Sequence, residues 1–154
     1  MNEYVIGYQL KIEPPQGGGD DTALNAIELR CAEFGNTTAS TYIYSGISKF
    51  GTWRGVGFCP DFKPVTGFRL KVEPLRDDGD DAAATNLQVW CGILPSGESL
   101  QAGYISDAAW GDWSSWAYCP EGWAVAGITT RIHECDDCDD TGLNGVEMRC
   151  RRYE

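Results

Sequence analysis

The stretch GFRLKVE, residues 67–73, decides the fold, because related stretches lie sixty residues before it and sixty residues after it. The earlier copy reads GYQLKIE at residues 7–13, and the later copy reads GITTRI at residues 127–132. Two adjacent aspartates follow each copy and begin eleven residues before a closing cysteine. A period this regular indicates one supersecondary unit repeated three times, each copy burying its apolar face against the others. The aspartate pairs are Asp20-Asp21, Asp80-Asp81 and Asp139-Asp140, and the closing cysteines are Cys31, Cys91 and Cys150.

Apolar and polar residues alternate along each copy, as they do in a half-buried strand. In the first copy, Tyr8 and Leu10 are predicted to face the core, while Gln9 faces water. A second alternating run ends at each closing cysteine, and a turn-rich loop separates the two runs. We therefore predict three hairpins that build an all-β core. The repeats span approximately residues 1–31, 32–91 and 92–150 of a single domain, 1–154.

The chain is strongly acidic, with a formal net charge of −11 over 154 residues and a pI of about 4.4. Such a surface repels a phosphate backbone, which argues against nucleic acid as a partner. Apolar runs are much shorter than the roughly 20 residues of a spanning helix, so we predict no membrane insertion. No signal peptide is visible in residues 1–10, so secretion requires that a signal was removed or lies outside this sequence.

Seven cysteines in so short a chain indicate an oxidising, extracellular compartment. Cys59 and Cys119, each followed by proline, are again sixty apart, and they precede closing cysteines by 32 and 31 residues. This spacing predicts the disulfides Cys59–Cys91 and Cys119–Cys150. Residues 36–38 form an N-glycosylation sequon, which is consistent with secretion.

Cys135 and Cys138 lie in a short acidic loop of the third copy. We interpret them as a local disulfide, with two free thiols as the alternative. A thioredoxin-like redox pair is disfavoured because no βαβ pattern surrounds them. A zinc site would need further ligands, and His133 is the only histidine in the chain.

Cys31 has no predicted partner, because the position sixty residues before Cys59 falls just before Met1. The tryptophan motif upstream of that cysteine, which contains Trp53 in the second copy and Trp113 in the third, has no counterpart in the first copy. We therefore expect an incomplete first repeat. Either the sequence is shortened, or another chain donates a strand at the N-terminal edge, since an uncovered edge strand is a pairing site.

Two segments carry a resemblance to a known family: residues 11–25, with the motifs KIEPPQ and DDTALN, and residues 110–120, with WGDW and Cys-Pro. From Tyr4 to Cys150 the chain resembles the vitelline membrane outer layer protein 1 family. The resemblance implies a type I β-prism, in which three Greek-key sheets surround a pseudo-three-fold axis. It also implies a secreted protein with a structural role in the outer layer of the egg's vitelline membrane. A lectin-like fold and a weak oligosaccharide-transfer activity are further implications.

The six paired aspartates are the first candidate ligand-binding site, since carboxylates in a glycine-rich loop are suitable ligands for Ca²⁺. They lack the spacing of an EF-hand, and a motif present in all three copies fits a requirement of the fold better than a single active site. We favour turn capping by the first aspartate of each pair. We predict no metal site and no cofactor.

Tryptophans form the second candidate site, because indole faces can stack on the C–H surfaces of sugars. Trp53 and Trp113 are sixty apart, which favours packing within the repeat. Trp116 and Trp123 have no equivalents and are the better ligand-binding candidates, although burial is the favoured alternative. Trp90 is predicted to point outward from its strand, where the other copies have arginine.

Catalysis on glycans usually needs two carboxylates at a defined separation. Glu13 and Glu73 are equivalent by repeat, with His133 at the third position, but no arrangement for acid–base chemistry is apparent. We therefore predict a secreted, non-catalytic structural protein of an extracellular coat or matrix, with extracellular glycoproteins or glycans as partners. The alternatives are a carbohydrate-binding, lectin-like protein and a weak oligosaccharide transferase that uses the two glutamates.

Overall fold

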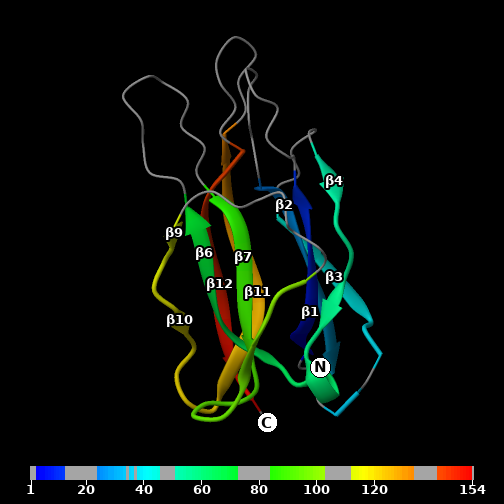
Figure 1. Cartoon of the computed structure of the whole chain (residues 1–154). Coiled ribbons are helices and arrows are strands. Elements are labelled where there is room, and N and C mark those ends of the chain that lie inside the picture. The colour runs from blue at the N-terminus through cyan, green and yellow to red at the C-terminus, as the bar shows by residue number, and fades with distance from the viewer. Residues whose placement is uncertain are drawn as a thin grey trace.

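The computed structural model describes residues 3–12, 24–33, 35–36, 38–45, 51–72, 84–102, 112–133 and 142–153, with the backbone alone at 131–133 and 142–145. Throughout these residues the regular structure is β, as predicted, apart from one turn of 3₁₀ helix (Figure 1). That turn, η1 at Pro60–Phe62, begins directly after Cys59. The chain is therefore an all-β protein.

Three long antiparallel hairpins stand side by side and form the body of the protein (Figure 1). Each hairpin pairs a valine with its closing cysteine, shifts register, and resumes pairing at the repeated glycine. A bulge at the same place in three hairpins bends each of them alike and increases its twist. The hairpins are β1 Glu3–Ile12 with β2 Leu24–Glu33, β6 Val65–Val72 with β7 Ala84–Cys91, and β11 Trp123–His133 with β12 Gly142–Arg152.

Shorter strands extend two of the hairpins into five-stranded sheets. In each sheet one strand lies beside the return strand, and two very short strands lie along the edge of the first strand. The first sheet holds β1–β5, the second holds β6–β10, and the third, within the described residues, holds β11 and β12. The added strands are β3 Thr41–Tyr44, β4 Thr52–Trp53, β5 Gly57–Phe58, β8 Glu98–Leu100, β9 Asp112–Trp113 and β10 Ala117–Tyr118.

Residues 52–58 and 112–118, which we call the first and second crossing segments, link neighbouring sheets. The first crossing segment pairs with β1, and the second pairs with β6. Because β2 lies on the other side of β1, both edges of β1 are occupied. The uncovered edge that we expect from the incomplete first repeat is therefore not at the N-terminal strand. In the third sheet the described strands pair only with each other, so the outer edges of β11 and β12 both lack a described partner strand.

Each crossing segment ends in a cysteine that bonds to the next sheet. Cys59 follows the first crossing segment and forms a disulfide with Cys91 of the second sheet. Cys119 follows the second crossing segment and forms a disulfide with Cys150 of the third sheet. The structure thus contains both disulfides that the spacing predicts. On the chain-entropy model, a disulfide that closes a loop of this length stabilises the folded state by about 3–4 kcal/mol.

The core lies where the inner faces of the hairpins meet. The first strands β1, β6 and β11 contact one another, and so do the return strands β2, β7 and β12. Leu10 and Ile27 are fully buried there. The buried Tyr8 hydroxyl donates to the carbonyl of Leu87 at 2.8 Å and accepts from the amide of Ala102 at 3.0 Å. A buried hydroxyl that is satisfied on both sides ties β1 to the second sheet without a desolvation penalty.

The repeated glycine marks the closest approach of a crossing segment to its hairpin. A β-carbon at Gly67 would lie 2.6 Å from Cδ1 of Tyr118 and 2.9 Å from the carbonyl oxygen of Ala117. Only glycine lets the two backbones approach this closely. At Gly127 the nearest atom would be Cβ of Arg149, at an ordinary contact distance of 3.6 Å.

We predict that Gly67→Ala destabilises the protein by about 1–3 kcal/mol, because the added methyl group overlaps the second crossing segment. The matched substitution Gly127→Ala should change the free energy of unfolding by less than about 0.5 kcal/mol. Urea denaturation followed by tryptophan fluorescence measures both values. Equal losses in the two variants would contradict the close approach at Gly67.

Candidate functional site

An exposed cluster of aromatic rings lies where the second crossing segment runs beside β6. Trp116 and Tyr118 are two residues apart, so their side chains leave the same face of the segment. Their rings are nearly parallel, at 17°, with centroids 5.9 Å apart. The Trp90 ring of β7 meets both edge-on, at 5.6 Å from Trp116 and 5.9 Å from Tyr118. These are preferred geometries for aromatic pairs, and they hold the rings in place.

Arg69 of β6 lies within this cluster and connects its members. Its guanidinium carbon is 4.6 Å from the Trp113 ring centroid and 4.8 Å from that of Trp116. Its Nε donates to Oε1 of Gln88 at 2.8 Å. The attraction of a cation to an indole face contributes about 0.5–2 kcal/mol, depending on exposure. We call the following set the aromatic face of the second sheet: Arg69, Trp90, Trp113, Trp116 and Tyr118.

The aromatic face suits a ligand that has both apolar and polar surface. Tyr118 is 45% exposed, and the indoles of Trp90 and Trp116 are half-buried, so ring surface is available to stack on pyranose C–H groups. Two cations contact the rings: Arg69, and Lys71 with its Nζ 5.9 Å from the Trp113 centroid. In a protein of net charge −11 these cations form a local site for hydroxyl or acidic groups.

The first sheet carries a related surface, but its arginine, Arg30, is paired with a carboxylate. Arg30 lies 4.5 Å from the Tyr42 ring centroid and forms an ion pair with Glu28, Nε to Oε1, at 2.7 Å. Burial raises the pKa of the Glu28 carboxyl, but hydrogen bonds from Arg30 and Tyr44 outweigh it and leave the pKa below its ordinary value. In the second sheet the residue equivalent to Glu28 is Gln88, so the hydrogen-bond partner of Arg69 there is a neutral amide.

Of the two tryptophans predicted to bind ligand, the structure brings one into the aromatic face. Trp116 belongs to it, whereas Trp123 begins β11, is 40% exposed and pairs with Arg152 in the third hairpin. No ring contact between described residues joins Trp123 to the aromatic face. Sequence reasoning misses Tyr118 and Arg69. The available signal is the spacing of two residues between Trp116 and Tyr118, which places both on one face.

The remaining predicted site residues lie outside the described part of the chain. His133 is the exception, because its backbone is described but its side chain is not. Where side chains are described, no group of three or more His, Cys, Asp or Glu residues could hold a metal ion. The predictions that fall outside the described residues concern Asp20, Asp21, Asp80, Asp81, Asp139, Asp140, Cys135, Cys138, Glu13 and Glu73.

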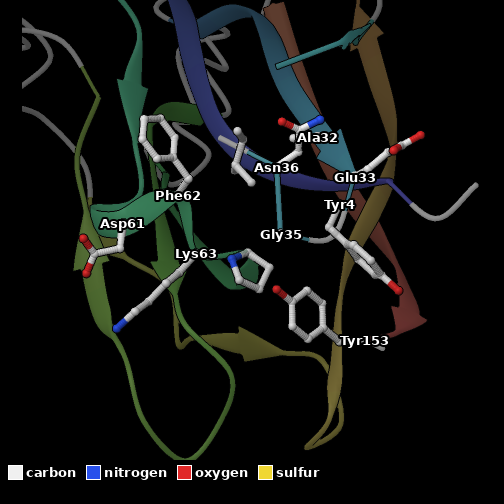
Figure 2. A pocket seen from close by; sticks show the side chains of 11 residues that line it. Tyr4, Ala32, Glu33, Gly35, Asn36, Asp61, Phe62, Lys63 and Tyr153 are labelled. Carbon is white, nitrogen blue, oxygen red and sulfur yellow. The ribbon is translucent and has the colours of Figure 1, made fainter. Parts of the chain in front are cut away.

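The two termini lie at the same end of the molecule (Figure 1). A small pocket near them is lined by Tyr4 and Tyr153. Figure 2 shows Asp61, Phe62 and Lys63 on one side of it, and Tyr4 and Tyr153 on the other. The two tyrosine rings are in edge contact, with centroids 4.8 Å apart. The cavity volume is about 150 Å³. Pockets for small-molecule ligands usually measure about 300–1,000 Å³. The aromatic face is therefore the better candidate site.

The fold and the site define a disulfide-linked all-β protein with an exposed aromatic face. The family described as Vitelline membrane outer layer protein I (VOMI) matches residues 1–153. The chain is 35% identical over 153 residues to the vitelline membrane outer layer protein 1 homolog of Mus musculus, and 38% identical over 152 residues to that of Homo sapiens. These matches cover 96% and 97% of this chain, and 71% of each relative. The chain therefore belongs to the vitelline membrane outer layer protein I family, as its motifs predict.

We predict that Arg69→Met loosens the aromatic face, because methionine keeps most of the apolar stem but removes the cation between two indoles. The free energy of unfolding should fall by about 0.5–2 kcal/mol, and the near-ultraviolet circular dichroism of the tryptophans should weaken. Arg151→Met, at an exposed position of β12, is the matched control and should change stability by less than about 0.5 kcal/mol. An unchanged spectrum in Arg69→Met would show that the rings hold their geometry without the cation.

Proposed function

We propose that the protein is a secreted, non-catalytic structural component of an extracellular coat or matrix. The observation that carries this proposal is the pair of disulfides, each of which links two sheets of a protein in the vitelline membrane outer layer protein I family. Structural disulfides of this kind persist in oxidising, extracellular surroundings. Asn36, the first residue of the sequon, is exposed, as glycosylation requires. None of the described residues forms a helix with the length and hydrophobicity needed to cross a membrane.

The architecture that we propose for this role is a type I β-prism with three Greek-key sheets around a pseudo-three-fold axis. Mutual contact among the three first strands, and among the three return strands, supports such an axis. The common register of the three hairpins supports it as well. A prism held by disulfides between sheets resists local opening, and this property suits a protein that must persist outside the cell.

The charges of the described side chains favour the non-catalytic role. Glycan cleavage uses two carboxyl groups, one of them with a raised pKa that lets it act as an acid. The aromatic face offers rings and cations instead. On the first sheet, Glu28 has a lowered pKa because hydrogen bonds from Arg30 and Tyr44 outweigh the effect of burial. A carboxyl group held in its charged form is the opposite of a general acid.

A second candidate function is carbohydrate binding at the aromatic face, and the Trp90–Trp116–Tyr118 cluster favours it. Aromatic rings that are fixed by their neighbours lose little conformational entropy when a sugar stacks on them. Binding of this kind would also give a structural protein its attachment to glycoproteins, so the two candidates are compatible. Weak oligosaccharide transfer is the least supported of the three functions.

We predict that labelled protein co-sediments with isolated egg-coat outer layer and with a mucin-type glycoprotein gel. Because the proposed role is structural, chitooligosaccharides incubated with the protein should keep their chain lengths, as measured by mass spectrometry. A protein unfolded by reduction of its disulfides is the control and should remain in the supernatant. Chain-length redistribution that depends on folded protein would contradict the non-catalytic role.

We predict that a glycan array with chitin and mucin-type oligosaccharides shows saturable binding. Trp116→Ala and Tyr118→Ala should each weaken it by about ten-fold or more, equivalent to about 1.4 kcal/mol, because each removes a stacking surface. Trp123→Ala, an exposed tryptophan outside the aromatic face, should bind as the natural protein does. A blank array from folded protein would refute carbohydrate binding and leave the structural role in place. Binding that needs Ca²⁺ would instead direct attention to the paired aspartates.

A further inference from the structure

Asn36 lies on a tight turn beside the small pocket near the termini. Its backbone amide donates to the carbonyl of Glu33 at 2.9 Å, and Gly35 within the turn has a φ of 78°, a conformation that glycine adopts without strain. Asn36 and Thr38, the two residues that define the sequon, are both exposed. The turn therefore presents a side chain to which an oligosaccharide can be attached in a secreted protein.

The pocket beside Asn36 combines apolar and polar surface. Tyr4, Ile6 and Pro64 are the buried residues that contribute its apolar part. Asn36 itself lines the pocket, and Figure 2 shows it together with Phe62 on the upper side of the view. A sugar has the same two kinds of surface, with C–H groups on its ring faces and hydroxyl groups around its edge. A sugar attached to Asn36 therefore begins at a surface of matching chemistry.

Phe62 supplies an aromatic ring that is exposed on this pocket. The side chain is 39% exposed, although its ring also contacts that of Phe58, with centroids 5.8 Å apart. Asp61 and Phe62 both have left-handed backbones, with φ of 54° and 52°. Bulky residues rarely adopt this conformation, and residues that do are concentrated at binding sites. The turn after Cys59 thus holds an apolar ring at the surface, beside the sequon.

Asp61 and Lys63, on either side of Phe62, offer hydrogen bonds to a sugar. Both residues are exposed, and neither side chain is paired with another residue in the part of the chain that the structure describes. A carboxylate accepts from sugar hydroxyls, and an ammonium group donates to them. A neighbouring cavity of about 240 Å³ is lined by the same two side chains, so the hollow surface continues beyond the first pocket.

Covalent attachment changes what a pocket of this size can hold. At about 150 Å³ the pocket is smaller than those that usually bind free ligands. A tethered sugar, however, is present at an effective concentration of about millimolar or more, so that weak contacts are enough to keep it in place. The pocket is therefore suited to the glycan of Asn36 and not to a diffusing sugar.

We propose that Asn36 carries an N-linked glycan whose first N-acetylglucosamine lies on the Phe62 ring, and that this contact stabilises the folded protein. The second sugar of the glycan then reaches Asp61 and Lys63. The inference rests on the secretion that is part of the proposed function, because N-glycans are added to secreted proteins. It is independent of carbohydrate binding at the aromatic face, which concerns free glycans and a different set of rings.

The test uses the full chain, secreted behind an added signal peptide from eukaryotic cells that make high-mannose glycans. Attachment then does not depend on where the protein is naturally located. Mass spectrometry should find a glycan on Asn36, and Thr38→Ala should abolish it. The glycosylated protein should have a Tm about 2–4 °C above that of Asn36→Gln, the shift expected when one ring gains a stacked partner. After endoglycosidase H leaves a single N-acetylglucosamine, most of this difference should remain.

Phe62→Ala is the variant that locates the contact. Without the ring, the glycan should raise the Tm by less than about 1 °C. Each variant is compared with and without its glycan, so the effect of the substitution on the bare protein cancels. Tyr42→Ala is the matched control, because Tyr42 is 50% exposed on β3 and does not line the pocket, and it should keep the full difference.

Nuclear magnetic resonance gives a second measurement on the trimmed glycoprotein. A sugar that lies on the face of an aromatic ring has its proton signals moved upfield by the ring current. Protons of the remaining N-acetylglucosamine should show this shift in the natural protein and in Tyr42→Ala, and should lose it in Phe62→Ala.

Three outcomes would overturn the proposal. The first is secreted protein with no glycan on Asn36. The second is an equal Tm for the glycosylated protein and Asn36→Gln. The third is a stabilisation by the glycan that persists in folded Phe62→Ala, which would mean that the sugar lies elsewhere. None of these results bears on the proposed coat function, which the co-sedimentation experiment tests separately.

Discussion

The close approach of a crossing segment to the repeated glycine is the constraint on which the rest of the structure depends. At Gly67 a ring and a backbone carbonyl occupy the space that any side chain would need. This contact brings the second crossing segment against β6 and carries Cys119 to the third sheet, where it bonds to Cys150. A glycine, an aromatic residue and a cysteine therefore act as one unit that orders a sheet and links it to its neighbour.

The same constraint creates the surface that we assign to binding. The crossing segment runs along the edge of its sheet, so its aromatic residues lie on the outside instead of in the core. Trp116 and Tyr118 then meet Trp90 of β7, and Arg69 connects them to Trp113. On the first sheet, Arg30 stands at the position equivalent to Trp90 and forms an ion pair with Glu28. Repeats of one backbone plan thus present different chemistry on their outer surfaces.

Rigidity is the property that this arrangement favours. Disulfides between sheets remove the freedom of the unfolded chain, and the buried Tyr8 hydroxyl ties the first sheet to the second. The third sheet differs, since among the described strands it consists of one hairpin alone.

The sequence by itself determined the hairpins and the disulfides Cys59–Cys91 and Cys119–Cys150, because a period of sixty and an alternation of two are local patterns that each copy repeats. It also determined the family, through motifs such as WGDW and Cys-Pro. Tertiary structure alone decided that Trp116 joins Trp90 while Trp123 does not. It also decided that both edges of β1 are paired, so the N-terminal strand is not an uncovered edge. The physical reason is that alternation tells which side chains point outward, whereas the order of strands in space decides which of them meet.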